Sequence, residues 1–306
     1  MAIVSPSGAV DPELIDGACE TLRMWGLQPV LGKTAKGRCG RFAGTDEERL
    51  ADLQWAMDSP DFAAILCGRG GYGAVRIVDK LHFDGIRQYP KWLIGFSDIT
   101  ALHARFFDEN FVSAHAVMAK AIAHADDNVE AVETLRKLLF GEHIHYVSYS
   151  NEKAAYNRSG YATGKLVGGN LSLLYALQGT PYALRPNGKI LFIEDLSERL
   201  YHIDRMVQNL RLSGVFDEIN GLIVGQFTNI DADPSFGQNI EEIILSAVGD
   251  REIPIVFNFP VGHVSENLAL PHGMNVHIEV QGDFFTGCIL QSSELCIEVQ
   301  LGLNSL

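Results

Sequence analysis

The sequence has no hydrophobic run long enough to cross a membrane. No stretch of its 306 residues approaches the roughly 18 uninterrupted apolar residues that a transmembrane helix needs. Residues 1–7 also lack the basic segment followed by an apolar one that marks a secretory signal, and they predict a first β-strand instead. These absences argue against a membrane-spanning protein.

Basic residues are scarce. The chain has 24 Lys and Arg against 38 Asp and Glu, a net charge of −14. Binding nucleic acid requires a basic surface that neutralises phosphates, and docking on anionic lipid requires one too. We therefore predict no nucleic-acid partner and no membrane partner. A local basic pocket for a small anionic ligand is compatible with this charge.

Metal-binding and disulfide patterns are also missing. The five cysteines are odd in number, scattered and without a Cys-x-x-Cys pair, which predicts reduced thiols and a cytoplasmic location. His143 and His145 form a close pair without a third ligand nearby, and no His-Glu-x-x-His motif occurs. We expect neither a metal nor another cofactor.

What the sequence does contain predicts a two-domain α/β protein. Its composition, 47% hydrophobic and 20% charged, is that of a globular chain, and its length suits two domains. The first half alternates strands, at 63–67 and 92–95, with helices that begin at Pro12, near Thr45, at Ala74 and after Ser97. Thr45 and Glu48 are spaced as in a capping box at the start of the second of these helices. This alternation indicates a parallel sheet with helices on both faces.

The second half is richer in sheet. Strands are expected at 189–194, 221–225 and 255–257, a helix at 204–212, and extended segments at 275–280, 284–290 and 295–301. We predict an N-terminal domain over residues 1–145, a connection over 146–163 and a mixed α+β domain over 164–306.

A first candidate site lies at Ser97, where a strand meets a helix. This order exposes the serine hydroxyl at the carboxyl edge of a parallel sheet, and the N–H groups of the helix N-terminus can stabilise an oxyanion. The pattern departs from the Gly-x-Ser-x-Gly nucleophile elbow because Ile99 replaces the second glycine. Alone, such a serine is more often a helix N-cap.

A glycine-rich turn at 68–73 is the second candidate. Gly68, Gly70 and Gly73 match the dinucleotide-binding pattern, but no ribose-binding acid follows about 20 residues later. Glycines also allow close approach of the backbone, so Gly70 or Gly71 could donate an N–H to an oxyanion. A plain tight turn fits the same residues.

Glu194, at the end of a predicted strand, and His263, after another, complete a candidate triad. A serine needs a histidine to accept its proton and an acid to orient that histidine. The order Ser, Glu, His along the chain is that of α/β-hydrolase triads. Singly, a carboxylate or a histidine in such a place is more often structural.

Several motifs together resemble the LD-carboxypeptidases, serine peptidases of murein recycling that include the microcin C immunity peptidases. The resemblance extends over essentially the whole chain. It rests on residues 44–49, 69–73, 95–102, 167–172, 191–198, 201–205 and 260–263.

This resemblance implies a flavodoxin-like N-terminal domain, related to class I glutamine amidotransferases, and a smaller, sheet-rich C-terminal domain. It implies that Ser97 is the nucleophile, Glu194 the acid and His263 the base, in a cleft between the domains. The N–H groups of Asp98 and of the Gly70-Gly71 turn would form the oxyanion hole. It also implies a homodimer.

The activity implied is release of terminal D-alanine from murein tetrapeptides. Arg69 is our candidate for binding the terminal carboxylate, because a guanidinium binds carboxylates bidentately, although a surface ion pair would explain it equally.

Two alternatives remain at this point. The first is a microcin C immunity-type peptidase acting on nucleotide amides, for which Tyr72, Trp92 or Tyr201 would stack on the base. The second is a non-catalytic nucleotide- or phosphate-binding domain. The chain departs from the family pattern at 115–118 and at His202, changes that could alter the pocket wall and the substrate.

Overall fold

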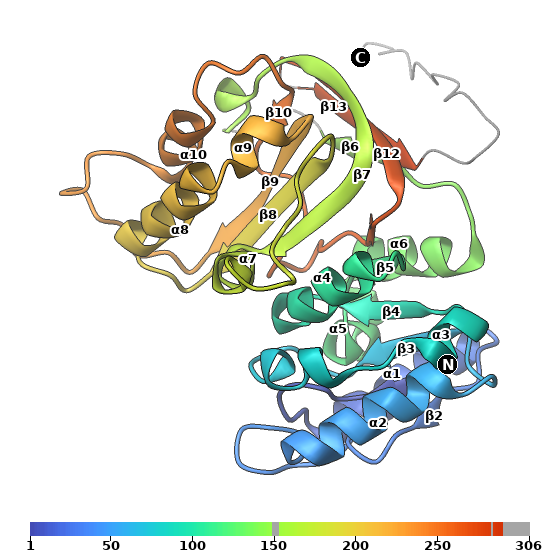
Figure 1. The fold of residues 1–306 in the computed structure, drawn as a ribbon. Coiled ribbons are helices and arrows are strands. Elements are labelled where there is room, and N and C mark those ends of the chain that lie inside the picture. The colour runs from blue at the N-terminus through green and yellow to red at the C-terminus, as the bar shows by residue number, and fades with distance from the viewer. Residues whose placement is uncertain (149–152, 283, 290–306) are drawn as a thin grey trace.

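The computed structural model describes residues 1–148, 153–282 and 284–289 and divides them between two lobes, each built on a β-sheet (Figure 1). The first sheet has the order β11-β5-β4-β3-β1-β2, and β1 to β5 are parallel. Its strands are β1 (Ala2–Val4), β2 (Val30–Leu31), β3 (Ala64–Cys67), β4 (Trp92–Gly95), β5 (Ser113–His115) and β11 (Leu270–His272).

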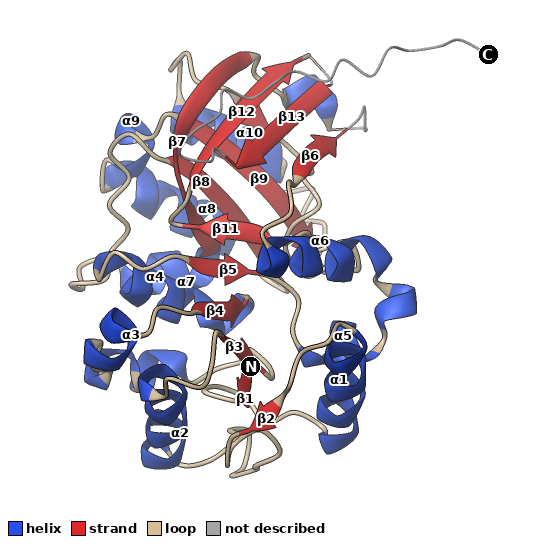
Figure 2. Ribbon diagram, turned by 90° about the vertical axis from the view of Figure 1, so that its right-hand side faces the viewer, coloured by secondary structure: helices blue, strands red, loops and turns tan. Residues whose placement is uncertain are grey.

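Helices cover both faces of this sheet, as Figure 2 shows. Successive strand residues alternate between two cores: Ile3 packs with the side of α1, α5 and α6, whereas Ala2 and Val4 pack with the side of α2 and α4. The predicted parallel sheet with helices on both faces is confirmed. The helices are α1 (Pro12–Met24), α2 (Asp46–Asp58), α3 (Asp84–Gln88), α4 (Thr100–Asp108), α5 (Ala119–Ala123) and α6 (Val129–Phe140).

The prediction of a regular helix from Ala74 is wrong. The segment forms two 3₁₀ turns, η1 (Ala74–Arg76) and η2 (Val78–Lys80), separated at Ile77, which has φ −124°. Ile77 and Val78 are both buried in the core beside α2 and α4. Burying two consecutive side chains on one side breaks the regular helix, so tertiary packing overrides the local pattern.

The second sheet is mixed. Its strand order is β10-β9-β8-β7-β12-β13-β6. Neighbours from β10 to β7 pair in parallel, and neighbours from β7 to β6 pair antiparallel, so β7 joins the two parts. Its strands are β6 (His145–Ser148), β7 (Gly160–Asn170), β8 (Ile190–Leu196), β9 (Gly221–Thr228), β10 (Ile255–Val256), β12 (Asn275–Gln281) and β13 (Phe284–Ile289). The expected segment at 295–301 lies outside the described residues.

Four helices pack on the parallel part of the second sheet around one apolar cluster. They are α7 (Leu171–Leu177), α8 (Leu200–Leu212), α9 (Val215–Glu218) and α10 (Ile240–Val248). The sheet-rich mixed α+β character expected of this half is confirmed.

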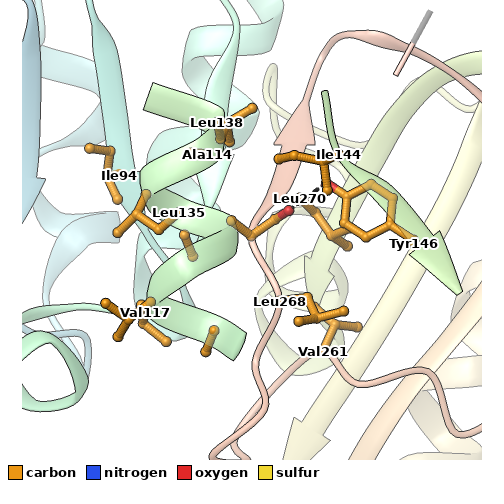
Figure 3. Close-up of a cluster of buried hydrophobic side chains, with 14 of the residues drawn as sticks. Ile94, Ala114, Val117, Leu135, Leu138, Ile144, Tyr146, Val261, Leu268 and Leu270 are labelled. Atoms are coloured by element: carbon orange, nitrogen blue, oxygen red, sulfur yellow. Dashed lines mark hydrogen bonds between the residues drawn. The ribbon is translucent and has the colours of Figure 1, made fainter. Parts of the chain in front are cut away.

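The two lobes share a strand and a core. β11 comes from the second half of the chain but pairs antiparallel with β5 of the first sheet. Buried side chains from both halves meet here, among them Leu135, Leu268 and Leu270, and the Tyr146 hydroxyl donates to the Ala269 carbonyl oxygen at 2.6 Å (Figure 3). The stretch 146–163, expected to be a connection, contains most of β6 and the start of β7.

Cys19, Cys39 and Cys67 are free thiols, but Cys288 is disulfide-bonded, so the expectation of reduced thiols is wrong for Cys288.

Within the described ranges, no helix combines the length and apolarity that crossing a bilayer would demand.

Candidate active site

Ser97 lies at a strained turn between β4 and α4. β4 ends at Gly95, Phe96 is still extended, and Ser97 opens a 3₁₀ turn (Ser97–Ile99) with φ 64°. A non-glycine residue in this left-handed region costs about 1–3 kcal/mol and is held there by its surroundings. The half-buried serine therefore stands at the carboxyl edge of the parallel sheet, as expected of a nucleophile elbow.

The glycine-rich turn packs directly against this serine. A methyl group at Gly70 would lie 2.9 Å from Ser97 Cβ and 3.2 Å from its Oγ, so only glycine fits without displacement. Gly71 adopts φ 106°, and the Gly8 N–H donates to the Gly70 carbonyl oxygen at 3.0 Å. The turn thus brings backbone close to the serine hydroxyl.

The buried Asp98 carboxylate joins three segments around the elbow. Its Oδ2 accepts a hydrogen bond from the Ser7 hydroxyl and another, at 2.8 Å, from the Ala74 N–H at the end of the glycine-rich turn. Burial raises the pKa of Asp98, while these hydrogen bonds and the charge of Arg49 oppose the rise. The side chain of Asp98 fixes the turn relative to the serine.

Arg49, fully buried on α2, also binds the segment that contains Ser7 and the glycine-rich turn. Its guanidinium donates to the Pro6 carbonyl oxygen, to the Gly73 carbonyl oxygen at 3.0 Å and to the Gly44 carbonyl oxygen at 3.3 Å, and it pairs with Asp46. The capping box of Thr45 and Glu48 positions this arginine by starting α2 at Asp46, three residues earlier.

Glu194 and His263 form the second half of the site. Glu194 is fully buried on β8, next to a register irregularity between Ile193 and Asp195, and its Oε2 lies 2.8 Å from His263 Nδ1. Because a carboxylate only accepts, Nδ1 carries the proton and Nε2 is left as the basic nitrogen. The His263 ring lies 4.9 Å from the ring of Phe96, the residue before Ser97.

The loop that carries His263 fits closely against Glu194. Gly262 has φ 119°, and a methyl group there would lie 2.9 Å from Glu194 Cβ. Its N–H donates to the side chain of the fully buried Asn267 at 2.8 Å. No hydrogen bond joins Ser97 to His263 in this structure; hydrogen bonds of this kind are often long before a substrate binds.

The two lobes are also joined next to the elbow. The Asn170 N–H, at the end of β7, donates to the Thr100 hydroxyl on α4 at 3.1 Å. Asp195, directly after Glu194, accepts from the Asn170 side chain and from the Ser172 N–H, both at 2.9 Å. Burial raises the pKa of Asp195 to about 7, and the neighbouring Glu194 charge adds to the rise against three opposing hydrogen bonds.

Several sequence candidates lie at the edge of this site or away from it. Arg69 is exposed beside the glycine-rich turn, with Nη1 donating to the Ala9 carbonyl oxygen at 2.8 Å. Tyr72 and Tyr201 are exposed, whereas Trp92 packs against the core and is not free to stack on a ligand. The unusual segment at 115–118 is buried and forms core rather than exposed pocket wall.

Ser7, Arg49, Asn170 and Asp195 were not predicted to have a role in the site. Each acts through a contact with a residue far away in the sequence, and none belongs to a recognisable catalytic pattern. Three signals were available: Arg49, Asn170 and Asp195 stand inside the matching motifs at 44–49, 167–172 and 191–198. Within the described part of the chain, no group of three or more His, Cys, Asp or Glu could hold a metal ion.

Comparison with known proteins gives one consistent result. Models of the LD-carboxypeptidase N-terminal and C-terminal domains match residues 1–116 and 163–278. A probable murein peptide carboxypeptidase of Bacillus subtilis is 36% identical over 281 residues, which cover 89% of this chain and 86% of that protein.

A crystal structure of muramoyltetrapeptide carboxypeptidase from Oxalobacter formigenes superposes with a TM-score of 0.84 at 26% identity, covering 94% of this chain and 99% of that one. The microcin C7 self-immunity protein MccF of Escherichia coli is 26% identical, over 85% of this chain and 83% of its own length. The chain belongs to the LD-carboxypeptidase family of serine-type hydrolases.

Proposed function

We propose that the protein is a serine carboxypeptidase that hydrolyses the L–D peptide bond before the terminal D-alanine of murein tetrapeptides. One observation carries the assignment of residues: an oriented Glu194–His263 pair lies beside Phe96, next to the strained Ser97, and Gly70 places backbone against the serine. A weak nucleophile, a base, an acid and nearby backbone N–H groups suffice for acyl transfer.

In the proposed mechanism, His263 Nε2 removes the proton of Ser97 as its Oγ attacks the amide carbonyl. Backbone N–H groups of Asp98 and of the Gly70-Gly71 turn stabilise the tetrahedral oxyanion. The protonated His263 then donates its proton to the departing amine of D-alanine. Water, deprotonated by His263, attacks the acyl carbonyl, and His263 returns this proton to Ser97 Oγ as the C–O bond to the peptide breaks. Glu194 keeps the imidazole in the required tautomer.

The substrate proposal is supported by relatives named for murein peptides. The Bacillus relative is 36% identical, against 26% for MccF. The two tyrosines considered for base stacking, Tyr72 and Tyr201, lie on different lobes and show no pairing with each other. Hydrolysis of nucleotide amides is therefore the second candidate, and nucleotide binding without catalysis is disfavoured by the oriented acid–base pair.

D-alanine release from a purified murein tetrapeptide, followed by mass spectrometry, tests this function. We expect release by the wild type, and a loss on the order of 10⁴-fold or more in kcat for Ser97→Ala and His263→Ala. Glu194→Gln should also lose most of kcat, because it removes the acid that orients His263. Glu218→Gln, which changes a carboxylate outside the site, is its matched control and should keep full activity. Full activity of Ser97→Ala would refute the nucleophile; activity on an aminoacyl-nucleotide amide alone would refute the substrate.

The predicted homodimer and the predicted cytoplasmic location complete the proposal. Light scattering after gel filtration measures the first, and cell fractionation measures the second. A monomer over the working concentration range, or recovery outside the cytoplasm, would contradict them.

A further inference from the structure

A cavity of about 400 Å³ lies between the lobes. Its walls come from α4 and β11 of the first sheet's lobe, and from β7, α7 and the segment between α7 and β8 of the second. Figure 1 shows α4 of the first lobe beside α7 and the end of β7 of the second. Its volume is within the range of small-molecule sites, about 300–1,000 Å³.

This cavity is separate from the proposed catalytic site. Ser97, Glu194 and His263 are not among the residues that line it. Ser97 precedes the first turn of α4, whereas the cavity contacts α4 at Ala104, Phe107 and Asp108. At about 1.5 Å per helical residue, Asp108 lies roughly 14 Å along α4 from the helix start, and Ala104 about half as far. On the second lobe, Lys189 lies just before β8 and Glu194 five residues further on, roughly 16 Å away at about 3.3 Å per residue.

The walls concentrate positive charge on a chain of net charge −14. The ammonium groups of Lys165 and Lys189 lie 5.8 and 5.7 Å from the centre of the Phe107 ring. Among the described residues, neither lysine forms an ion pair with a carboxylate. Arg185 also lines the cavity and pairs with Asp108 at 2.9 Å.

The two ammonium groups therefore lie near the same aromatic ring, and the Lys189 ammonium donates a hydrogen bond only to the Asn187 carbonyl oxygen, at 3.1 Å, among the described residues. Burial lowers the pKa of Lys189, and the charges of Lys165 and Arg185 lower it further, while Glu218 acts in the opposite direction. Like charges held close together are costly, and an anion between them would remove that cost.

Much of the remaining wall is apolar, and it also holds a buried polar group without a partner. Leu174, Leu177 and Leu184 line the cavity beside Val167. His272 lines it too; it is buried, and its Nδ1 has no hydrogen-bond partner. Burial holds the pKa of His272 well below its ordinary value, so the neutral ring can donate or accept one hydrogen bond.

We propose that this cavity binds a small organic anion, with its acidic group between Lys165 and Lys189 and its apolar part against Leu174 and Leu177. An inorganic anion would use the lysines but leave the leucine wall and most of the volume empty. A ligand in this position would touch both lobes and stabilise their arrangement.

Titration calorimetry with the organic anion 1-anilinonaphthalene-8-sulfonate tests the proposal on the full chain. We expect saturable binding by the wild type that Lys165→Gln/Lys189→Gln weakens by roughly tenfold or more, because each lysine contributes a charge-assisted contact. Lys33→Gln/Lys137→Gln removes the same charge elsewhere and should bind like the wild type. Ala183→Trp, which keeps both lysines but fills the cavity, should also lose binding.

We expect Ser97→Ala to bind the anion like the wild type, and the double lysine variant to hydrolyse the tetrapeptide like the wild type. The test of the cavity therefore does not depend on the proposed function. Absence of binding by the wild type would overturn the proposal. So would equal binding by the two double variants, or full binding by Ala183→Trp.

Discussion

Gly70 and Ser97 are in direct contact, although 27 positions separate them in the sequence. A methyl group on Gly70 would come within 2.9 Å of Ser97 Cβ and 3.1 Å of the Phe96 carbonyl oxygen. Neither neighbour can move freely, because one is on a strained residue and the other belongs to the backbone. The position of the glycine-rich turn and the position of the serine therefore depend on each other.

Gly70→Ala is accordingly expected to damage catalysis more than folding. The added methyl displaces either the turn or the serine, so kcat should fall on the order of 10²–10³-fold, the usual cost of losing one oxyanion donor. D-alanine release measures kcat, and circular dichroism with thermal melting checks that the variant folds.

A matched control is available in Gly141→Ala. Gly141 also has a positive φ, 69°, but a methyl group there meets no atom within 4 Å. It should cost about 1–2 kcal/mol of stability and leave kcat unchanged. Equal kcat for Gly70→Ala and the wild type would show that the turn does not assist catalysis.

The side chain of Asp98 is expected to be a positioning group that does not touch the substrate. Its Oδ2 accepts both hydrogen bonds, from Ser7 and Ala74, and its Oδ1 has no partner in the described structure. Asn can keep both bonds by placing its single oxygen at the Oδ2 position, whereas Ala leaves both donors unpaired.

Asp98→Ala should therefore lower kcat with little change in KM, and lower stability by about 1–3 kcal/mol. Asp98→Asn should recover most of kcat, and Ser7→Ala should show a smaller loss in the same direction. Steady-state kinetics and urea unfolding measure these effects. Equal losses for Asn and Ala would mean that the charge of Asp98 matters, not its hydrogen bonds.

Arg69 is expected to bind the terminal carboxylate of the peptide. One end of its guanidinium is fixed by the Ala9 carbonyl oxygen at 2.8 Å, and the side chain is exposed beside the glycine-rich turn. Because lysine cannot reproduce a bidentate contact, Arg69→Lys should raise KM on the order of tenfold with kcat nearly unchanged. Arg38→Lys, at an exposed ion pair with Asp11, is the control. An unchanged KM would remove Arg69 from substrate binding.

The features that the sequence predicted correctly depend on the local order of residues or on complete motifs. The strand, turn and helix around Ser97 follow from the pattern at 92–107, and the capping box of Thr45 and Glu48 forms as expected. Local patterns succeed where hydrophobic periodicity and capping agree with the tertiary fold.

Contacts between distant segments could not be read in this way. The pairing of β11 with β5 places residues 270–272 in a sheet formed otherwise by the first half of the chain. Nothing in the composition of so short a strand indicates its partner. The buried Arg49 also looks like a surface residue of a charged helix until the carbonyl groups of Pro6 and Gly73 are placed around it.

The last prediction concerns stability and pH. Burial raises the pKa of Asp195 from 3.8 to about 7, so the folded protein holds this proton more tightly than the unfolded chain does. Between these two values the folded state binds more protons, and the free energy of unfolding falls as pH rises, by up to about 4 kcal/mol. Above pH 7 both states are ionised and the contribution becomes constant.

Asp195→Asn removes this titration and leaves the other ionisable groups, including Asp98, in place. The advantage of the wild type over the variant in urea unfolding should therefore be largest near pH 4 and shrink steadily towards pH 7. The variant also places an amide among the N–H donors of Asn170, Ser172 and Leu196, which adds a loss that does not depend on pH. Parallel stability curves for the two proteins from pH 4 to pH 7 would show that Asp195 is ionised throughout that range.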